Sequence, residues 1–179
     1  MDPHLQRLQQ EIADAISIFN SEQLAWHQAD KWSASEVLEH LYLTYTGTLK
    51  GCGRVLEIGR PMISPSTLKK RAQSMIVVGL GYMPSGRKSP AVAQPRGLGP
   101  EKVVPGITDK IGEMDAALSQ CAERFGTRAK VLDHPVLGPF SVAQWRKFHL
   151  VHGLHHVKQI RRLGEQVRTT KAQPSLVQK

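Results

Sequence analysis

The sequence predicts an all-α fold, a bundle of four long helices with a long irregular connection between the second and the third. Apolar residues recur every three or four positions in four separate stretches, and helix caps flank these stretches. No convincing run of strands is present. The length of 179 residues suits one domain, which we place over residues 1–168, followed by a flexible polar tail over 169–179.

The first two helices are predicted from a cap followed by apolar spacing. Asp2 is a plausible N-cap, and apolar residues then recur at helical spacing as far as Phe19. The second helix begins at a capping box formed by Ser33 and Glu36 and ends at Gly59. Its expected buried face consists of Val37, Leu41, Tyr45, Leu49, Cys52 and Leu56.

The connection over residues 59–106 holds seven of the eleven prolines, so it is expected to be the least regular part of the chain. Within it, residues 66–76 predict a short basic amphipathic helix capped by Ser66. Its expected inward face consists of Leu68, Ala72, Met75 and Ile76. The stretch 85–97 is expected to be an exposed basic loop that an anionic substrate could meet through charge attraction.

The third and fourth helices complete the bundle. The 4-3-4-3-4 spacing of apolar residues predicts a helix over 107–125. Residues 134–139 contain two prolines and a glycine and are expected to form a turn. After it, Ser141 and Gln144 form a second capping box, which opens a helix expected to run to about Gly164.

Composition narrows the classes of function. The net charge of +9 and the pI near 9.8 suggest nucleic-acid binding, but the basic residues are spread over several elements, so we expect no specific nucleic-acid partner. The longest apolar stretch, Met75 to Met83, is too short to span a membrane, so we expect no membrane partner. The amino terminus lacks the features of a secretory signal, which predicts a cytoplasmic protein. Cys52 and Cys121 are expected to be reduced core thiols.

Four histidines on the expected last helix are the main functional signal. His152 and His156 are four residues apart, so their rings lie one above the other and can bind one divalent metal. Two protein ligands are too few for tight binding, and His40 on the second helix is the candidate for a third. In the alternative interpretation the helix pair lies on a solvated face, and His40 is a hydrogen-bonded core histidine. The pairing of all three leads us to favour ligation.

These residues also carry a resemblance to a known family. Trp32 and Ser33, followed by His40, resemble the element in the second helix of DinB-like (YfiT-type) four-helix-bundle proteins. His152, His156 and Gln159 are similar to the H-x-x-x-H-x-x-Q element in the last helix of that family. The long middle connection and the turn before the last helix resemble a subfamily of unknown function.

The resemblance implies a DinB/YfiT-like bundle and a three-histidine site for zinc or nickel with open coordination positions. Family members of known activity are metal-dependent thiol transferases that use bacillithiol, mycothiol or glutathione, and a few are isomerases or hydrolases. The resemblance therefore implies a low-molecular-weight thiol as a second cofactor, a small-molecule substrate and a homodimer. The basic middle loop and the extra histidine at His149 depart from the plainer members.

Each ligating ring needs a hydrogen-bond partner on its other nitrogen, and Gln159 and Glu39 are candidates for that role. His149 is interpreted as a competing ligand, a residue beside the ligands, or a surface residue. His155 is expected at the surface, and His134 is expected to take part in the turn that it begins. Trp32 and Trp145, each near the start of a helix, are expected to be packing anchors.

Three functions are compatible with these observations. The leading one is a metal-dependent transferase or hydrolase that uses the three histidines. The second is a non-catalytic bundle that holds a small molecule or sequesters metal. The third is nucleic-acid binding, for which the net charge is the sole evidence. Binding through phosphate contacts would require the affinity to fall steeply as the salt concentration rises.

Overall fold

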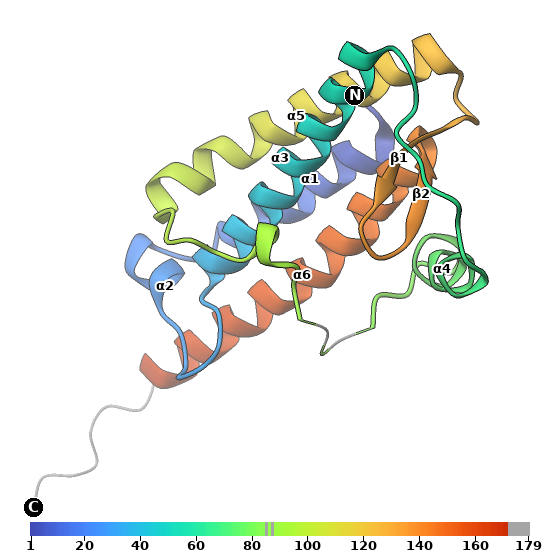
Figure 1. Ribbon diagram of the computed structural model, residues 1–179. Coiled ribbons are helices and arrows are strands. Elements are labelled where there is room, and N and C mark those ends of the chain that lie inside the picture. The colour runs from blue at the N-terminus through green and yellow to red at the C-terminus, as the bar shows by residue number, and fades with distance from the viewer. Residues whose placement is uncertain (85, 87, 172–179) are drawn as a thin grey trace, which may run out of the picture.

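The computed structural model of the protein is mostly helical, with six α-helices and one two-stranded sheet in the residues that it describes, 1–84, 86 and 88–171. Four long helices run roughly alongside one another (Figure 1). They are α1 (Pro3–Ile16), α3 (Ala34–Ile58), α5 (Pro100–Phe125) and α6 (Val142–Lys171). Helix α3 packs chiefly against α5, α1 packs against α6, and α3 also contacts α6. The helical character of the predicted all-α fold is thus confirmed, apart from the small sheet.

The caps lie where the sequence predicts them. The Asp2 side chain accepts a hydrogen bond from the His4 N–H and starts α1. Both hydrogen bonds of the Ser33 and Glu36 capping box are present at the start of α3, and Gly59 ends that helix with a φ of 77°. The second capping box joins Ser141 to Gln144 at the start of α6. These caps fix the ends of the helices that carry the histidines.

The core fills the space between the long helices. The apolar faces predicted for α3 and α5 point into it, with Leu49, Leu56 and Phe125 partly buried and the remaining members buried. Cys52 and Cys121 are both buried and unpaired by a disulfide. Burial raises the pKa of the Cys52 thiol to about 12, so both cysteines fit the predicted role of reduced core residues.

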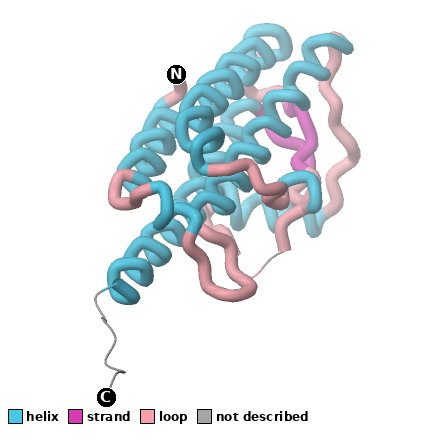
Figure 2. The backbone as a smooth tube through the Cα atoms, turned by 90° about the vertical axis from the view of Figure 1, so that its left-hand side faces the viewer, coloured by secondary structure: helices cyan, strands magenta, loops and turns pink. Residues whose placement is uncertain are grey.

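The turn predicted over 134–139 is the tip of a β-hairpin, which the sequence analysis did not predict. Strands β1 (Lys130–His134) and β2 (Gly138–Ser141) pair in antiparallel register and lie beside the long helices (Figure 2). The strands have four and five residues and contain a proline and a glycine, so they give little alternating signal. Leu132 of β1 packs against Gly51 of α3, where any β-carbon would lie 2.5 Å from it.

Helix α5 begins at Pro100, seven residues earlier than predicted. Gly99 occupies its N-cap and Pro100 its first position, where a missing N–H costs nothing. Pro105 lies inside the helix, although the irregular connection was predicted to extend over residues 59–106. Because Val103 is completely buried, packing of this first turn outweighs the one hydrogen bond that Pro105 cannot make.

The ends of the first and last helices also differ from the prediction. Helix α1 ends at Ile16, and a short helix, α2 (Ser21–Ala25), follows where a plain connection was expected. Helix α6 continues past Gly164 to Lys171. Gly164 is a packing position rather than a terminator, because a β-carbon there would lie 2.6 Å from the side chain of Ile18. Residues 172–179 of the predicted tail lie outside the described residues.

The short basic helix exists, but its predicted orientation is wrong. It is α4 (Leu68–Ser74), capped by Thr67 rather than Ser66, and it continues as a π-helical turn, η1 (Met75–Gly79). All four residues predicted to face inward are exposed, and Val77 and Val78 are buried instead. The rest of the connection includes a 3-10 turn, η2 (Ala91–Ala93). In the loop predicted over 85–97, Ser85 and Arg87 lie outside the described residues.

Within the described part of the chain, every helix is too short or too polar to cross a bilayer.

Candidate metal centre

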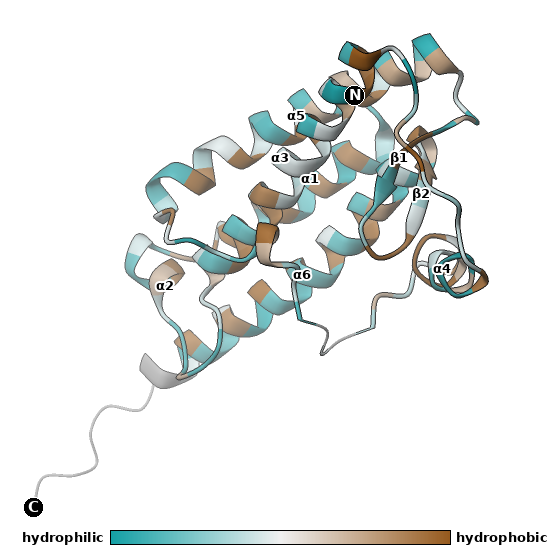
Figure 3. Ribbon diagram, viewed as in Figure 1, coloured by the Kyte–Doolittle hydropathy of each residue, from teal (hydrophilic) through white to brown (hydrophobic). Residues whose placement is uncertain are grey.

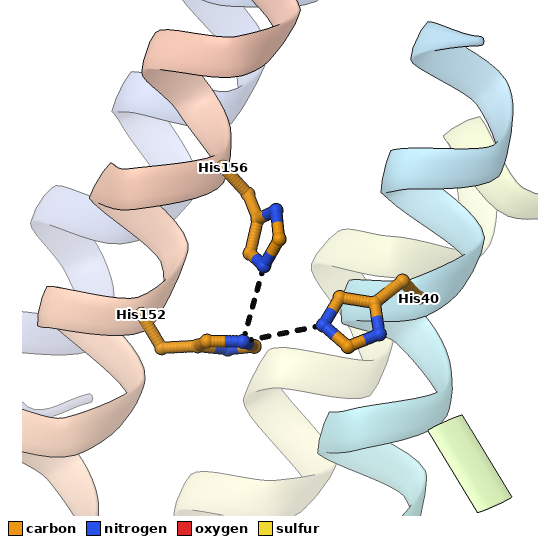
Figure 4. Close-up of side chains that lie close together, drawn as sticks. All are labelled: His40, His152 and His156. Carbon is orange, nitrogen blue, oxygen red and sulfur yellow. Dashed lines mark hydrogen bonds between the residues drawn. The ribbon is translucent and has the colours of Figure 1, made fainter. Parts of the chain in front are cut away.

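Three histidine side chains from two helices converge between α3 and α6. His40 lies in the second turn of α3, and His152 and His156 lie one turn apart on α6 (Figure 4). Their ligand atoms lie within 4.8 Å of one another. This is the only such group of histidine, cysteine or carboxylate side chains found among the described residues. The structure thus brings together the three residues predicted as ligands.

The distances between the ring nitrogens match those around one small cation. His152 Nε2 lies 3.2 Å from His40 Nε2 and 3.2 Å from His156 Nε2. Bonds of about 2.0–2.1 Å to a tetrahedral zinc ion would hold two nitrogens about 3.3 Å apart. Two of the three nitrogen pairs therefore already stand at the separation that a tetrahedral site requires, and such a site would have a fourth position for a ligand from outside the protein.

Hydrogen bonds prepare two of the three rings for ligation. His40 Nδ1 lies 2.7 Å from the Ala93 carbonyl oxygen, and His156 Nδ1 lies 3.0 Å from Gln159 Oε1. Because both partners are acceptors, each Nδ1 carries the proton, and each Nε2 presents a lone pair to the centre of the site. The predicted partner Gln159 does contact a ring of the cluster.

His152 is held by packing instead. Its ring stacks on Phe148 with 5.3 Å between centroids and 10° between planes. Its Nδ1 is buried and has no hydrogen-bond partner in the described part of the chain. Trp32 lies against the first member of the cluster, with 5.4 Å between its ring centroid and that of His40. Two aromatic walls therefore shield the histidines from water and fix their rotamers.

Burial keeps these imidazoles neutral. Burial lowers the pKa of His40, although its hydrogen bond to Ala93 acts in the opposite direction. Burial and the neighbouring rings lower the pKa of His152 well below the usual value, and burial lowers that of His156 to about 3. A neutral imidazole has the lone pair that a metal needs, so the site needs no deprotonation before a cation binds at neutral pH.

Glu39 lies outside the cluster and acts on the loop beside it. Its carboxylate is completely buried and accepts hydrogen bonds from three successive backbone N–H groups. These belong to Arg96 at 2.6 Å, Gly97 at 3.2 Å and Leu98 at 3.0 Å. The same loop supplies the Ala93 carbonyl to His40. Glu39 thus contacts no ligand ring, contrary to its expected role, and supports one through the loop.

The other histidines on α6 and in the hairpin do not belong to the group of possible ligands. His149 is completely buried, with Nε2 3.1 Å from Thr48 Oγ1, so it is neither a surface residue nor a member of the group. His134 Nδ1 accepts hydrogen bonds from the backbone N–H groups of residues 136 and 137, which confirms its predicted part in the turn. His155 is half-buried beside the ring of His156.

Two contacts of the site were not predicted. The Ala93 carbonyl belongs to the backbone, and a backbone acceptor has no signature in a sequence. Ser89 Oγ lies 3.2 Å from His40 Nδ1 and shares the same proton. The nearest sequence signal for these two contacts is Pro90, which lies between Ser89 and the η2 turn that contains Ala93. A short turn that begins at a proline is common, so this signal does not indicate a metal site.

The fold and the site define a mostly helical protein with a three-histidine group that can hold a divalent metal ion. The family model described as "Protein of unknown function (DUF1569)" matches residues 2–163. Because this is most of the chain, the protein belongs to that family. Comparisons with curated proteins and with solved structures gave no match. The family match assigns no activity and makes no link to the DinB-like proteins.

Proposed function

We propose that the protein is a divalent-metal-dependent enzyme of the DinB-like (YfiT-type) kind, with zinc or nickel held by His40, His152 and His156. Its reaction is the transfer of a low-molecular-weight thiol to a small electrophilic substrate, or the hydrolysis of such a substrate. The observation that carries the proposal is the convergence of three neutral imidazoles, whose ligand atoms all lie within 4.8 Å of one another, with His152 Nε2 3.2 Å from each of the other two Nε2 atoms.

The donor set fits this chemistry. Three neutral ligands would leave the double positive charge of a bound ion uncompensated, and a fourth coordination position would be open to water or a thiol. When bound, such an ion lowers the pKa of that water or thiol, which supplies a nucleophile near neutral pH. A site closed by four protein ligands would serve a structural role instead.

The protein's own residues orient and shield the site. The Ala93 carbonyl and Gln159 fix the tautomers of two rings, and Phe148 and Trp32 exclude water from their faces. Arg96 lies on the loop that Glu39 holds and that supplies the Ala93 carbonyl to His40. Its exposed side chain gives this loop a positive charge, which can attract the carboxylates of a thiol cofactor.

The first test is metal content. The protein is purified without a histidine tag, and bound metals are measured by mass spectrometry before and after incubation with zinc or nickel. We expect one ion per chain. The His152→Ala variant loses it, because two ligands bind weakly. His4→Ala is the matched control, since His4 is an exposed histidine on α1 outside the cluster, and this variant keeps the ion.

The second test separates an enzyme from a metal-binding bundle. The metal-loaded protein is mixed with glutathione, bacillithiol or mycothiol and an electrophile such as a chlorinated nitrobenzene, and loss of free thiol is followed. Loss that requires the metal supports a transferase, and metal-dependent hydrolysis of activated esters without thiol supports a hydrolase. A protein that stays metal-free with both ions refutes the proposal, and tight metal binding without turnover leaves a non-catalytic binding protein.

A further inference from the structure

Residues 58–100 differ from the rest of the chain in charge. They contain seven lysines and arginines and no aspartate or glutamate, so they carry most of the net charge of +9. They also contain nine of the twelve large hydrophobic side chains that are exposed in the described part of the chain. Positive charge without any neighbouring acidic residue thus coincides with exposed apolar side chains in one connecting segment.

Helix α4 shows the pattern most clearly, because its apolar face points away from the protein. Leu68 is 82% exposed, and Met75, seven residues later, is 64% exposed. Positions seven apart lie on nearly the same side of a helix, and Ala72 lies between them on that side. In Figure 3 the helix lies at the outer edge of the molecule and shows brown apolar bands beside teal polar ones.

Cations stand on both sides of this apolar stripe. At 100° per residue, Lys69 lies on one side of Leu68 and Arg71 on the other, and both are exposed. Neither forms an ion pair with the part of the chain that the structure describes. The opposite side of the segment is buried through Val77 and Val78. The buried side of the segment therefore packs on the protein, and the exposed side of α4 is an apolar stripe flanked by cationic side chains.

We propose that the segment around α4 docks the protein on an anionic phospholipid surface. Leu68 and Met75 enter the boundary between headgroups and acyl chains, and Lys69 and Arg71 meet the lipid phosphates and carboxylates. Leu80 and Tyr82, which are 75% and 62% exposed just after the helix, extend the apolar contact. The expectation of no membrane partner rested on the lack of a spanning segment, and peripheral docking needs none.

Other binding partners complement only some of the side chains on this surface. A nucleic acid would neutralise the cations but would leave Leu68 and Met75 against phosphate. A second copy of the chain in a symmetric dimer would place one cationic border against another. A fluid anionic surface accommodates both kinds of side chain and requires no shaped groove.

The test is sedimentation of the protein with lipid vesicles. We expect binding to vesicles of phosphatidylcholine mixed with one third phosphatidylserine, little binding to phosphatidylcholine alone, and weaker binding at high salt. The double variant Leu68→Gln, Met75→Gln lowers the partition coefficient about tenfold or more, because two apolar side chains no longer insert. Lys69→Gln or Arg71→Gln lowers it about fivefold each.

Ile18→Gln is the matched control, because Ile18 is 42% exposed but lies outside the segment, and its partition coefficient stays unchanged. All the substituted residues are exposed, and circular dichroism verifies that the variants fold. Absence of binding to the mixed vesicles overturns the proposal and leaves an acidic protein as the occupant. If the double variant binds the mixed vesicles as well as the wild type does, the apolar stripe does not insert, and charge attraction alone overturns the proposal. A dimer that the double variant dissociates overturns it in favour of a second copy.

Discussion

Replacement of Glu39 by glutamine tests whether the loop beside the site controls the histidine cluster. The glutamine has the same shape, but it has no charge and one of its two ends is a donor. In its best orientation the amide oxygen still accepts from Gly97 and Leu98, and the NH₂ group then faces the Arg96 N–H, which lies 2.6 Å from the carboxylate. One strong hydrogen bond becomes a contact between two donors, and the other two weaken.

The structure sets the expected size of the effect. A hydrogen bond to a charged acceptor contributes about 1.5–3 kcal/mol, so Glu39→Gln lowers the free energy of unfolding by about 3 kcal/mol. The loosened loop no longer holds the Ala93 carbonyl 2.7 Å from His40 Nδ1. Loss of such an outer hydrogen bond reduces metal affinity about 10–100-fold. Glu39 contacts no ligand ring, so an effect on affinity must pass through the loop.

Both quantities are measured on the same preparation. Urea unfolding of the metal-free protein gives the free energy of unfolding, and competition with a chromophoric chelator gives the zinc affinity. Glu36→Gln is the matched control, because Glu36 lies one turn away and serves the capping box, in which glutamine works equally well. Its stability and affinity stay near those of the wild type. If Glu39→Gln also leaves both quantities unchanged, the loop does not position His40, and the reasoning is refuted.

Three further predictions concern single contacts. Gln159→Ala removes the acceptor that fixes a ligand ring and lowers zinc affinity about tenfold or more in the same chelator competition, with stability nearly unchanged. Burial lowers the pKa of His134 to about 4, while in the unfolded chain it is about 6.5, so the unfolded state alone gains this proton as the pH falls between those values. Stability therefore falls by about 3 kcal/mol over that range, and His134→Asn gives a shallower slope in urea unfolding at several pH values. Gly153→Ala places a β-carbon against the buried Leu8 side chain and costs about 1–3 kcal/mol by thermal unfolding. Gly47→Ala, whose β-carbon meets no neighbour, stabilises α3 by about 0.5–1 kcal/mol.

Elements whose information is local were predicted well. The capping box of Ser33 and Glu36 and the stop at Gly59 fix both ends of α3, because each signal acts within a few residues. The i, i+4 pair of His152 and His156 is likewise a property of one helix. That His40 meets this pair needed a tertiary contact between α3 and α6. The sequence offered His40 as a candidate on the second helix, and the resemblance supported its place in the site.

Elements fixed by packing were missed. The start of α5 is associated with burial of Val103, and the continuation of α6 past Gly164 is associated with burial of Val167. In both cases a proline or a glycine suggested an end that tertiary contacts override. The hairpin is too short to give a periodic signal, and its position depends on the contact between Leu132 and Gly51.

Helix α4 shows the clearest limit of sequence patterns. An amphipathic pattern states that the residues of one face belong in an apolar environment, but it does not state whether the protein or a partner supplies it. Leu68 and Met75 were predicted to face the core because a core is the usual environment, and both face outward. The absence of any acidic residue between Glu57 and Glu101 was visible in the sequence. Together with the apolar stripe, that charge pattern favours a surface helix, because a helix that packs on its own protein has no need to exclude negative charge over so long a segment.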